Sequence, residues 1–275
     1  MASHKLPLDV LYALLEHMDH DKAGLATLCL VSRVFKEASE SVLYRRIVMP
    51  LPAVSRVCMS LACSRLATHV RHFETSKKPG WKPRDARELL HMRTALRKMT
   101  GLRVLRIHFG GPMAWILDGC HFTQLRSMLC NLSCDHHLAD FFRRQVQLTD
   151  VTLSSIHTHH FPCHIDQACL PNLRQISAEP AWLSMLVPCR PITNIDIWDF
   201  VETDNMESDW LLQSSSAVTS LSVSESFLIS RGVACIASLV PQLRQLTIKC
   251  GTTDLFSDEV RTDCTGLNPH ITKAF

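Results

Sequence analysis

Apolar and polar residues near the start of the chain alternate with the spacing of short amphipathic helices. Between residues 6 and 47, apolar residues recur at intervals of three and four, which places them on one side of a helix. The first apolar stripe consists of Leu11, Leu14, Leu15 and Met18, and a second set consists of Leu25, Leu28 and Val31. Ser32 can cap a third helix, whose inner face would carry Phe35, Ala38 and Val42. The pattern predicts three short helices.

A segment of this length needs a partner for its remaining apolar surface. About 40 residues rarely bury enough apolar surface to be stable without a disulfide, a metal or a neighbouring element. No disulfide or metal staple is evident between residues 6 and 47. We therefore expect part of the apolar surface of these helices to pack against another body.

A second pattern repeats from residue 44 onward: an apolar residue, two variable residues, an apolar residue, one variable residue and a third apolar residue. Its clearest copy is Leu102, Leu105 and Ile107. The first positions of the nine copies are Tyr44, Val70, Leu102, Leu125, Leu148, Leu173, Ile192, Val218 and Leu243. They are spaced by 19 to 32 residues, which is centred on the period of leucine-rich repeats, about 20–29 residues.

The repeat predicts a parallel sheet. The last two apolar positions of each copy lie two residues apart, so they point to the same side of a short strand. Stacked copies form a sheet, and the returning segments close the core from one side. Returning helices are expected at 53–67, 84–99, 135–145 and 227–240. The predicted fold is α/β: an N-terminal three-helix segment, then an irregular leucine-rich-repeat-like solenoid of eight or nine parallel strands. An all-β or a doubly wound sheet is the alternative.

The N-terminal segment resembles the F-box. The family pattern opens with Leu-Pro-x-acid, which Leu6, Pro7 and Asp9 match. It continues with an aliphatic run that ends in Val-Ser-Arg-x-aromatic, matched at 28–35, and closes with Leu-aromatic-Arg, matched at 43–45. The rest of the chain resembles F-box proteins with poorly conserved leucine-rich repeats. The resemblance implies an F-box at 1–48 and a substrate-binding solenoid at 49–275.

The resemblance also implies a function. F-box segments dock on the small Skp adaptor of cullin-based (SCF) ubiquitin ligases, and the rest of such a chain recruits a protein substrate. The chain is thus expected to be a substrate receptor, a subunit without catalytic activity. The residues expected to contact the adaptor, or to pack behind that contact, are Leu6, Pro7, Leu11, Leu14, Leu15, Leu28, Val31 and Phe35. Two alternatives remain: a plain helical cap on the solenoid, and a leucine-rich-repeat scaffold with no ligase role.

Composition and charge indicate the class of protein and the cellular compartment to expect. Hydrophobic content of 46% and charged content of 20% are typical of a folded globular chain. The net charge of +3 gives no general argument for nucleic acid. No apolar run reaches the length of a membrane span, and the N-terminus lacks the apolar core of a signal peptide. We therefore expect the cytoplasm or nucleus, with the 12 scattered cysteines as reduced thiols in the core.

Three further clusters carry possible chemistry. Cysteines and histidines are enriched at 130–169, but their spacing matches no zinc-finger pattern, so a histidine-rich surface loop is the alternative to a metal site. The basic stretch 77–106 could bind an acidic substrate, a phosphopeptide or nucleic acid, although a solvated helix face is favoured. The acidic residues at 196–209 could bind a basic peptide or form a surface loop.

Neither the motifs nor the C-terminal tail points to chemistry. Motifs of nucleophilic, nucleotide-binding or zinc-peptidase catalysis are missing from the sequence, so no enzyme activity and no cofactor are expected. The polar tail at 254–275 either caps the solenoid or belongs to a shortened version of a longer protein.

Overall fold

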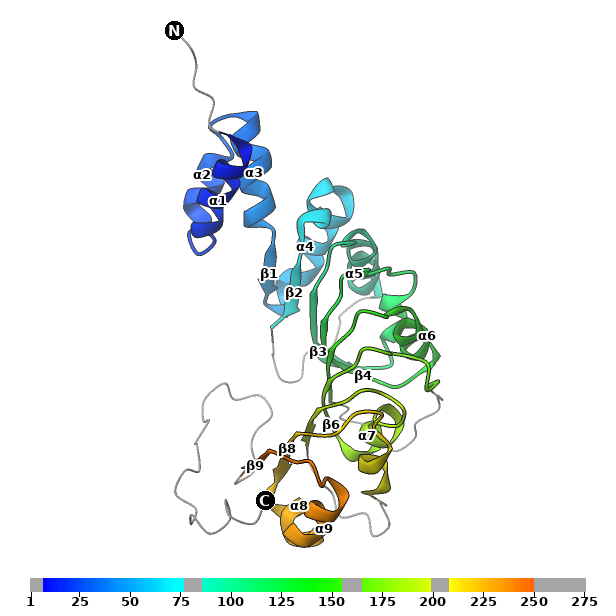
Figure 1. Ribbon diagram of the computed structural model, residues 1–275. Helices are drawn as coiled ribbons and strands as arrows, with labels where there is room; N and C mark the ends of the chain where they lie inside the picture. Colours follow the sequence, from blue (N-terminus) through cyan, green and yellow to red (C-terminus); the bar gives the residue numbers. More distant parts are fainter. Residues whose placement is uncertain (1–6, 77–85, 155–164, 199–207, 250–275) are drawn as a thin grey trace. The chain divides into compact units, whose positions relative to one another are not determined.

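The computed structural model describes residues 7–76, 86–154, 165–198 and 208–249 (Figure 1). These residues form nine α-helices and nine strands. The strands lie in one sheet in the order β1 to β9, which is also their order along the chain, and the strand pairs β1–β2, β2–β3 and β4 through β9 are parallel. The predicted α/β fold with a parallel sheet is confirmed. The strand order never reverses, unlike that of a doubly wound sheet.

The chain divides into two compact units. Unit 1 consists of Met1–His108 and Ile116–Leu125, and unit 2 consists of Phe109–Trp115 and Arg126–Phe275. The expected domain boundary at residue 48 stays a prediction.

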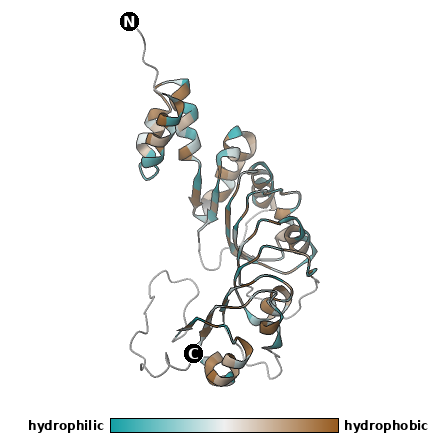
Figure 2. Ribbon diagram, viewed as in Figure 1, coloured by the Kyte–Doolittle hydropathy of each residue, from teal (hydrophilic) through white to brown (hydrophobic). Residues whose placement is uncertain are grey.

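Unit 1 begins with three helices, α1 (Leu8–His17), α2 (Lys22–Leu28) and α3 (Arg33–Leu43). Their shared core consists of Leu11, Leu15, Leu25, Ala38 and Val42. The Asp21 carboxylate accepts a hydrogen bond from the Gly24 amide at 2.8 Å, and the Ser32 hydroxyl accepts one from the Phe35 amide. These caps satisfy donors that have no partner within the helix. The prediction of three short helices is confirmed, and Figure 2 shows hydrophobic and hydrophilic residues on each of them.

The first repeats complete unit 1. They consist of β1 (Arg46–Met49), α4 (Leu51–Cys63), the 3-10 helix η1 (Arg65–His69), β2 (His72–Thr75), α5 (Ala86–Lys98) and most of β3 (Val104–Gly111). The short helix η2 (Ala114–Leu117) follows. Ile47 pairs with Phe73, and Phe73 pairs with Leu105. The middle apolar residues of the predicted repeats therefore lie side by side, and α4 and α5 cover the same side of these strands (Figure 1).

Unit 2 continues the same arrangement. Its elements are β4 (Ser127–Leu132), α6 (His136–Arg144), β5 (Asp150–Leu153), β6 (Gln175–Ala178), α7 (Pro180–Leu186), β7 (Asn194–Ile197), η3 (Ser208–Gln213), β8 (Ser220–Ser224), α8 (Glu225–Arg231), α9 (Val233–Leu239) and β9 (Gln245–Lys249). The paired middle positions are Met128, Val151, Ile176, Ile195, Leu221 and Leu246. All of these except Leu246 are at most 2% exposed.

The returning segments differ from the prediction at two places. The single helix expected at 227–240 is two short helices, because Gly232 separates them with a backbone φ of 75°, a conformation that a helix interior excludes. The helix α7 was not predicted. Pro180 opens it, a position that proline tolerates well, and its seven residues are too few to show a helical period.

Eight of the nine described cysteines are not disulfide-bonded, and four of these are buried and behave as small core residues: Cys58, Cys120, Cys130 and Cys169. Burial raises the pKa of Cys58 and of Cys130 to about 12, because a thiolate loses its hydration in an apolar interior. Cys134 is the exception: it is disulfide-bonded, which corrects the expectation of a reduced thiol there. Sequence alone does not say which sulfur atoms meet.

A buried arginine holds the turn between α7 and β7 in unit 2. Arg190 is 0% exposed, and its guanidinium donates hydrogen bonds of 2.8–3.2 Å to five backbone carbonyls. These belong to Asp166, Cys169, Met185, Leu186 and Pro188. Two of them are carbonyls at the end of α7, which have no partner within the helix. Arg190 therefore closes the helix end and ties the preceding turn to it.

Within the described part of the chain, no helix is long and apolar enough to cross a membrane.

Replacing Arg190 should destabilise unit 2 strongly. We expect Arg190→Met to lower the free energy of unfolding by roughly 2–4 kcal/mol, because several buried carbonyls lose their donor together. Urea unfolding followed by circular dichroism measures the effect. The matched control is Arg144→Met, an exposed arginine on α6, which should change the free energy by no more than about 0.5 kcal/mol. Equal effects of the two changes would contradict the role given to Arg190.

Thiol reactivity should follow burial. In the native protein at neutral pH, iodoacetamide should modify the exposed thiols of Cys63 and Cys189 well before those of Cys58 and Cys130, because only the thiolate reacts. Peptide mass mapping over a time course measures the order. In urea the four sites should react at similar rates, and early labelling of Cys130 in the native protein would contradict the described core.

Candidate partner-binding face of the helical segment

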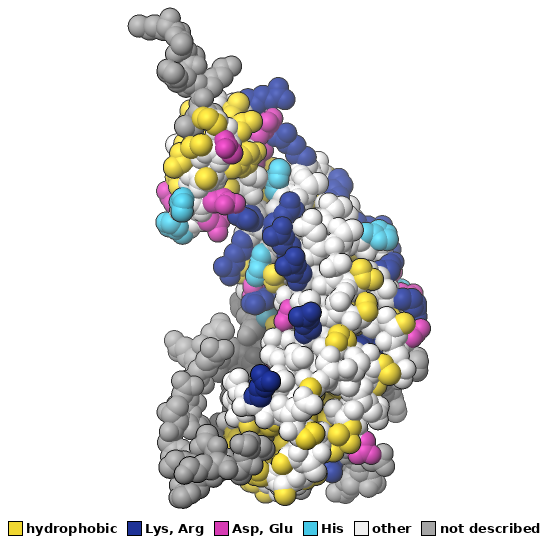
Figure 3. Space-filling model, in the orientation of Figure 1, with side chains coloured by type: hydrophobic (Ala, Val, Ile, Leu, Met, Phe, Trp, Pro, Cys, Tyr) yellow, Lys and Arg dark blue, Asp and Glu magenta, His cyan; other side chains and the backbone are white. Residues whose placement is uncertain are grey.

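The three N-terminal helices carry many apolar side chains that their own core does not bury. Leu8 and Leu14 on α1 are 57% and 53% exposed, and Leu30 and Val31, between α2 and α3, are 87% and 62% exposed. Val10, Tyr12 and Val34 are also exposed. We call these seven residues the apolar face. Figure 3 shows hydrophobic side chains gathered over this segment.

The helix period explains how α1 presents this face. Leu11 and Leu15 point into the core and are 3% and 2% exposed. At 100° per residue, Val10 and Leu14 fall on one flank of that buried stripe. Leu8 and Tyr12 fall on the other flank. The helix thus carries apolar residues over a wider arc than three packed helices can cover, and the excess lies on the surface.

The turn before α3 adds the most exposed members. The amides of Leu30 and Val31 donate to the carbonyls of Thr27 and Leu28 at 3.0 and 3.1 Å, so the backbone of this turn is satisfied internally. The Ser32 cap then starts α3 directly after it. Two aliphatic side chains are therefore held outward on an ordered turn, in a position that contributes nothing to the core.

The predicted site residues divide into two groups. Leu11 and Leu15 belong to the core, and Leu28 and Phe35 pack partly against it, so these four can only support a contact from behind. Pro7, Leu14 and Val31 are exposed. Leu14 lies on a flank of the stripe formed by Leu11 and Leu15, so of the predicted residues on α1 it is one that a partner can reach. Leu6 lies outside the described residues.

Five members of the apolar face escaped sequence reasoning. Leu8, Val10, Tyr12, Leu30 and Val34 are not among the residues that the sequence pattern assigned to the adaptor contact. Their signal is the number of apolar residues, since Asp9 is the one residue of 8–15 that is neither apolar nor aromatic. Such a run exceeds what one helix face can bury.

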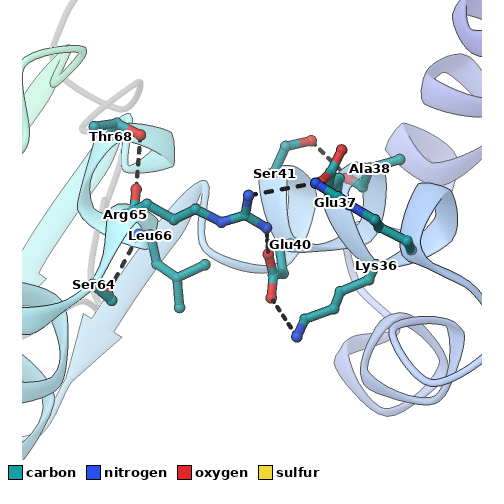
Figure 4. A network of polar contacts seen from close by, with 10 residues as sticks. Lys36, Glu37, Ala38, Glu40, Ser41, Ser64, Arg65, Leu66 and Thr68 are labelled. Atoms are coloured by element: carbon teal, nitrogen blue, oxygen red, sulfur yellow. Dashed lines mark hydrogen bonds and ion pairs between the residues drawn. The ribbon is translucent and has the colours of Figure 1, made fainter.

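Ion pairs connect the helical segment to the first repeat of unit 1. The Arg65 guanidinium, on η1, donates to the Glu40 carboxylate on α3 at 3.1 Å and lies 3.7 Å from that of Glu37 (Figure 4). Lys36 lies 3.9 Å from the other oxygen of Glu40. The Glu40 side chain is only 11% exposed, so water screens this cluster less than a surface pair. The contact orients α3 against η1.

The strand surface of unit 2 offers a different kind of site. A hollow of about 540 Å³ lies over the starts of β5, β6 and β7. Its lining is entirely polar: Gln147, Thr149, Asp150, Asn172, Arg174, Gln175, Thr193 and Asn194. These side chains can form hydrogen bonds with a polar ligand, and the Thr149 hydroxyl already donates one to the Asp150 carboxylate at 2.5 Å.

Asp196, one of the two described members of the acidic cluster, has a structural role. The Asp196 carboxylate accepts hydrogen bonds from Ser177 and Trp198 and forms an ion pair with Lys249 at 2.6 Å. It thus connects three strands of unit 2 and is not available to a basic ligand. The part of the cluster at 199–207 lies outside the described residues.

The other two clusters are only partly described. No group of three or more potential metal ligands exists among the described residues, and residues 155–164 of the histidine-rich stretch lie outside them. Residues 77–85 of the basic stretch also lie outside. On α5, Arg93 lies 3.7 Å from the Asp118 carboxylate and Arg97 donates to the Asp118 carbonyl, so these two arginines hold the neighbouring turn.

Compared with known proteins, the chain matches no protein-family model and no curated protein sequence. The case for a function therefore depends on the residues themselves.

Substitutions of two adjacent leucines on α1 test whether Leu15 belongs to the helical core and Leu14 to the apolar face. Leu15→Ala should lower the free energy of unfolding of the helical segment by roughly 2–4 kcal/mol, because it leaves a cavity among Leu11, Leu25 and Val42. Leu14→Ala should change it by less than about 0.5 kcal/mol. Thermal unfolding followed at 222 nm compares the two. A larger effect at Leu14 would mean that the face is part of the core.

Proposed function

We propose that the chain is the substrate-recognition subunit of a cullin-based ubiquitin ligase. The three helices dock on the Skp adaptor, and the repeats hold a protein substrate. The subunit itself performs no catalysis and acts in the cytoplasm or nucleus. The observation that carries the proposal is the apolar face: seven exposed apolar side chains on a small helical segment whose own core is already filled.

The composition of the face supports docking to a folded protein. Exposed apolar patches rimmed by polar residues are typical of protein–protein contact sites. Leucine and valine side chains spaced three or four residues apart on a helix can insert together into an apolar groove of a partner protein. The face lies in the part of the chain that resembles the F-box, so the adaptor of that family is the partner we propose.

In this proposal, the predicted residues have two different roles. Pro7, Leu14 and Val31 contact the adaptor together with Leu8, Val10 and Leu30. Leu11, Leu15, Leu28 and Phe35 fix the backbone behind them. The Glu40–Arg65 ion pair keeps the docked helices oriented toward the repeats, which supports transfer to a substrate held there.

The rival is a repeat scaffold with no link to a ligase. In that case the apolar face would cover a solenoid end or bind another partner. The observation that supports this rival is the polar hollow over β5, β6 and β7 in unit 2. A peptide could bind there in a protein that has no role in ubiquitin transfer. Adaptor binding separates the two proposals.

Two acidic substitutions on the face should abolish adaptor docking. Leu14→Asp combined with Val31→Asp should weaken binding to a purified Skp adaptor by about 100-fold or more, because each buries a carboxylate at an apolar contact. Calorimetric titration measures the affinity. The matched control is Ile229→Asp, an exposed residue of α8 at 77%, which should bind like the unaltered chain.

The outcomes have distinct meanings. If the unaltered chain does not bind the adaptor, the ligase proposal fails and the scaffold remains. If the double variant binds normally while it keeps the circular dichroism spectrum of the unaltered chain, the apolar face is not the docking surface.

A further inference from the structure

The last strand of unit 2 has apolar residues that are only half-buried. In the strand before it, β8, the two apolar residues of the repeat, Leu221 and Val223, are 0% exposed. Their counterparts in β9, Leu246 and Ile248, are half-buried. In stacked repeats each strand is covered by the next one, and β9 is the last strand of the described sheet (Figure 1). The sheet therefore ends with an open apolar row.

One backbone carbonyl directly before a strand repeatedly accepts two hydrogen bonds from the next repeat. In unit 1 this position is held by Arg45, Arg71 and Arg103. In unit 2, the Thr219 carbonyl accepts from the amide of Arg244 and from the amide after it, at 2.9 and 3.0 Å. The Arg244 carbonyl holds the same position before β9, but among the described residues no such pair of amides donates to it.

The outer edge of β9 exposes further backbone groups. The Gln245 amide donates to the Thr219 carbonyl, so it faces β8. Successive backbone groups of a strand face opposite sides in the plane of the sheet. The amides and carbonyls of Leu246 and Ile248 therefore face away from β8, where another strand can pair with them.

This edge lacks the usual protection against pairing. Proteins commonly protect an edge strand with a proline, a bulge or an outward charge. Residues 245–249 contain no proline and pair with β8 residue by residue, without a bulge. Their one charged residue, Lys249, forms an ion pair with Asp196 at 2.6 Å. The edge is thus open in backbone, shape and charge.

The residues of β9 complement themselves in an antiparallel pair. In a two-fold arrangement centred on Thr247, Leu246 of each copy lies opposite Ile248 of the other, and the two residues exchange both of their outward hydrogen bonds. Opposite residues point to the same face of a sheet, so the half-buried apolar residues cover each other. Thr247 lies opposite Thr247, and Gln245 lies opposite Lys249, so no like charges meet.

The first strand of the sheet does not offer an equal match. In a head-to-tail contact that continues the repeat, the amides of Arg45 and Arg46 of one copy would donate to the Arg244 carbonyl of another. The Arg45 amide already donates to the Val42 carbonyl at 3.2 Å, where α3 ends. A closed two-fold pair is therefore favoured over an open chain of copies.

We propose that two copies of this chain associate through β9 and form a continuous sheet across a two-fold axis at Thr247. The inference goes beyond the proposed function and does not rest on it, because neither the adaptor nor a substrate takes part. The contact is short, so we expect a weak and reversible association, in the micromolar range. The pair carries two N-terminal helical segments and can engage two adaptors.

Sedimentation equilibrium of the full chain tests the inference. As the concentration rises through the micromolar range, the mass should rise from that of one chain to that of two. Thr247→Lys places two like charges opposite each other at the axis and should weaken the association by about 5-fold or more. Thr247→Glu should do the same. An equimolar mixture of the two variants sets opposite charges against each other and should restore the association to within about 2-fold.

Two controls accompany the charge exchange. Ser184→Lys adds the same charge at an exposed position of α7 in the same unit and should change the association by less than about 2-fold. Because Thr247 is exposed, both of its variants should keep the circular dichroism spectrum of the unaltered chain.

Each contrary result overturns the inference. A chain that stays monomeric leaves β9 to another occupant, such as residues 250–275 of the same chain. A mass that keeps growing with concentration indicates head-to-tail addition. A dimer that survives Thr247→Lys but dissociates with Leu14→Asp and Val31→Asp is built on the apolar face. Adaptor binding is measured separately, so a monomeric chain that binds the adaptor overturns this inference alone.

Discussion

The side-by-side register of one apolar residue from each repeat is the constraint on which the rest of this structure depends. A strand of four or five residues is too short to be stable alone, so each one is held by the strands beside it. Ile47, Phe73 and Leu105 are neighbours in unit 1, as Val151, Ile176 and Ile195 are in unit 2. A shift by one residue would turn these side chains away from the core. The helices can vary in length and position because they only need to cover the row of apolar side chains that the strand register creates.

The same register builds the outward surface. The residue directly before each strand lies beside the equivalent residue of the next repeat. When several repeats carry the same residue type at this position, their side chains form a continuous column. Arg45, Arg71 and Arg103 form such a column. Asp196 on β7 shows the opposite case, because Lys249 on β9, two strands away, neutralises its charge.

The helical segment follows different rules. Its core holds only five buried hydrophobic residues, and its apolar residues exceed what that core can take in. The connection to the repeats uses the chain itself and the Glu40–Arg65 cluster. Ion pairs of this exposure contribute only modestly to stability, so their effect is mainly orientation. This excess of outward apolar side chains is what supports the proposed contact with an adaptor protein.

The sequence by itself determined the parts of this protein that depend on periodicity. Repeats of apolar residues two and three apart predicted the parallel strands. Intervals of three and four, together with Ser32 as a cap, predicted the N-terminal helices. The tertiary structure decided the features that do not follow from a repeating spacing of apolar residues. It placed Leu14 on the surface while Leu15 entered the core, split one helix at Gly232 and enclosed Arg190 among five carbonyls. Among the described residues, it left Arg71 and Arg103 without a carboxylate partner. These features depend on the packing of side chains and on individual backbone torsions, neither of which is specified by the spacing of apolar residues.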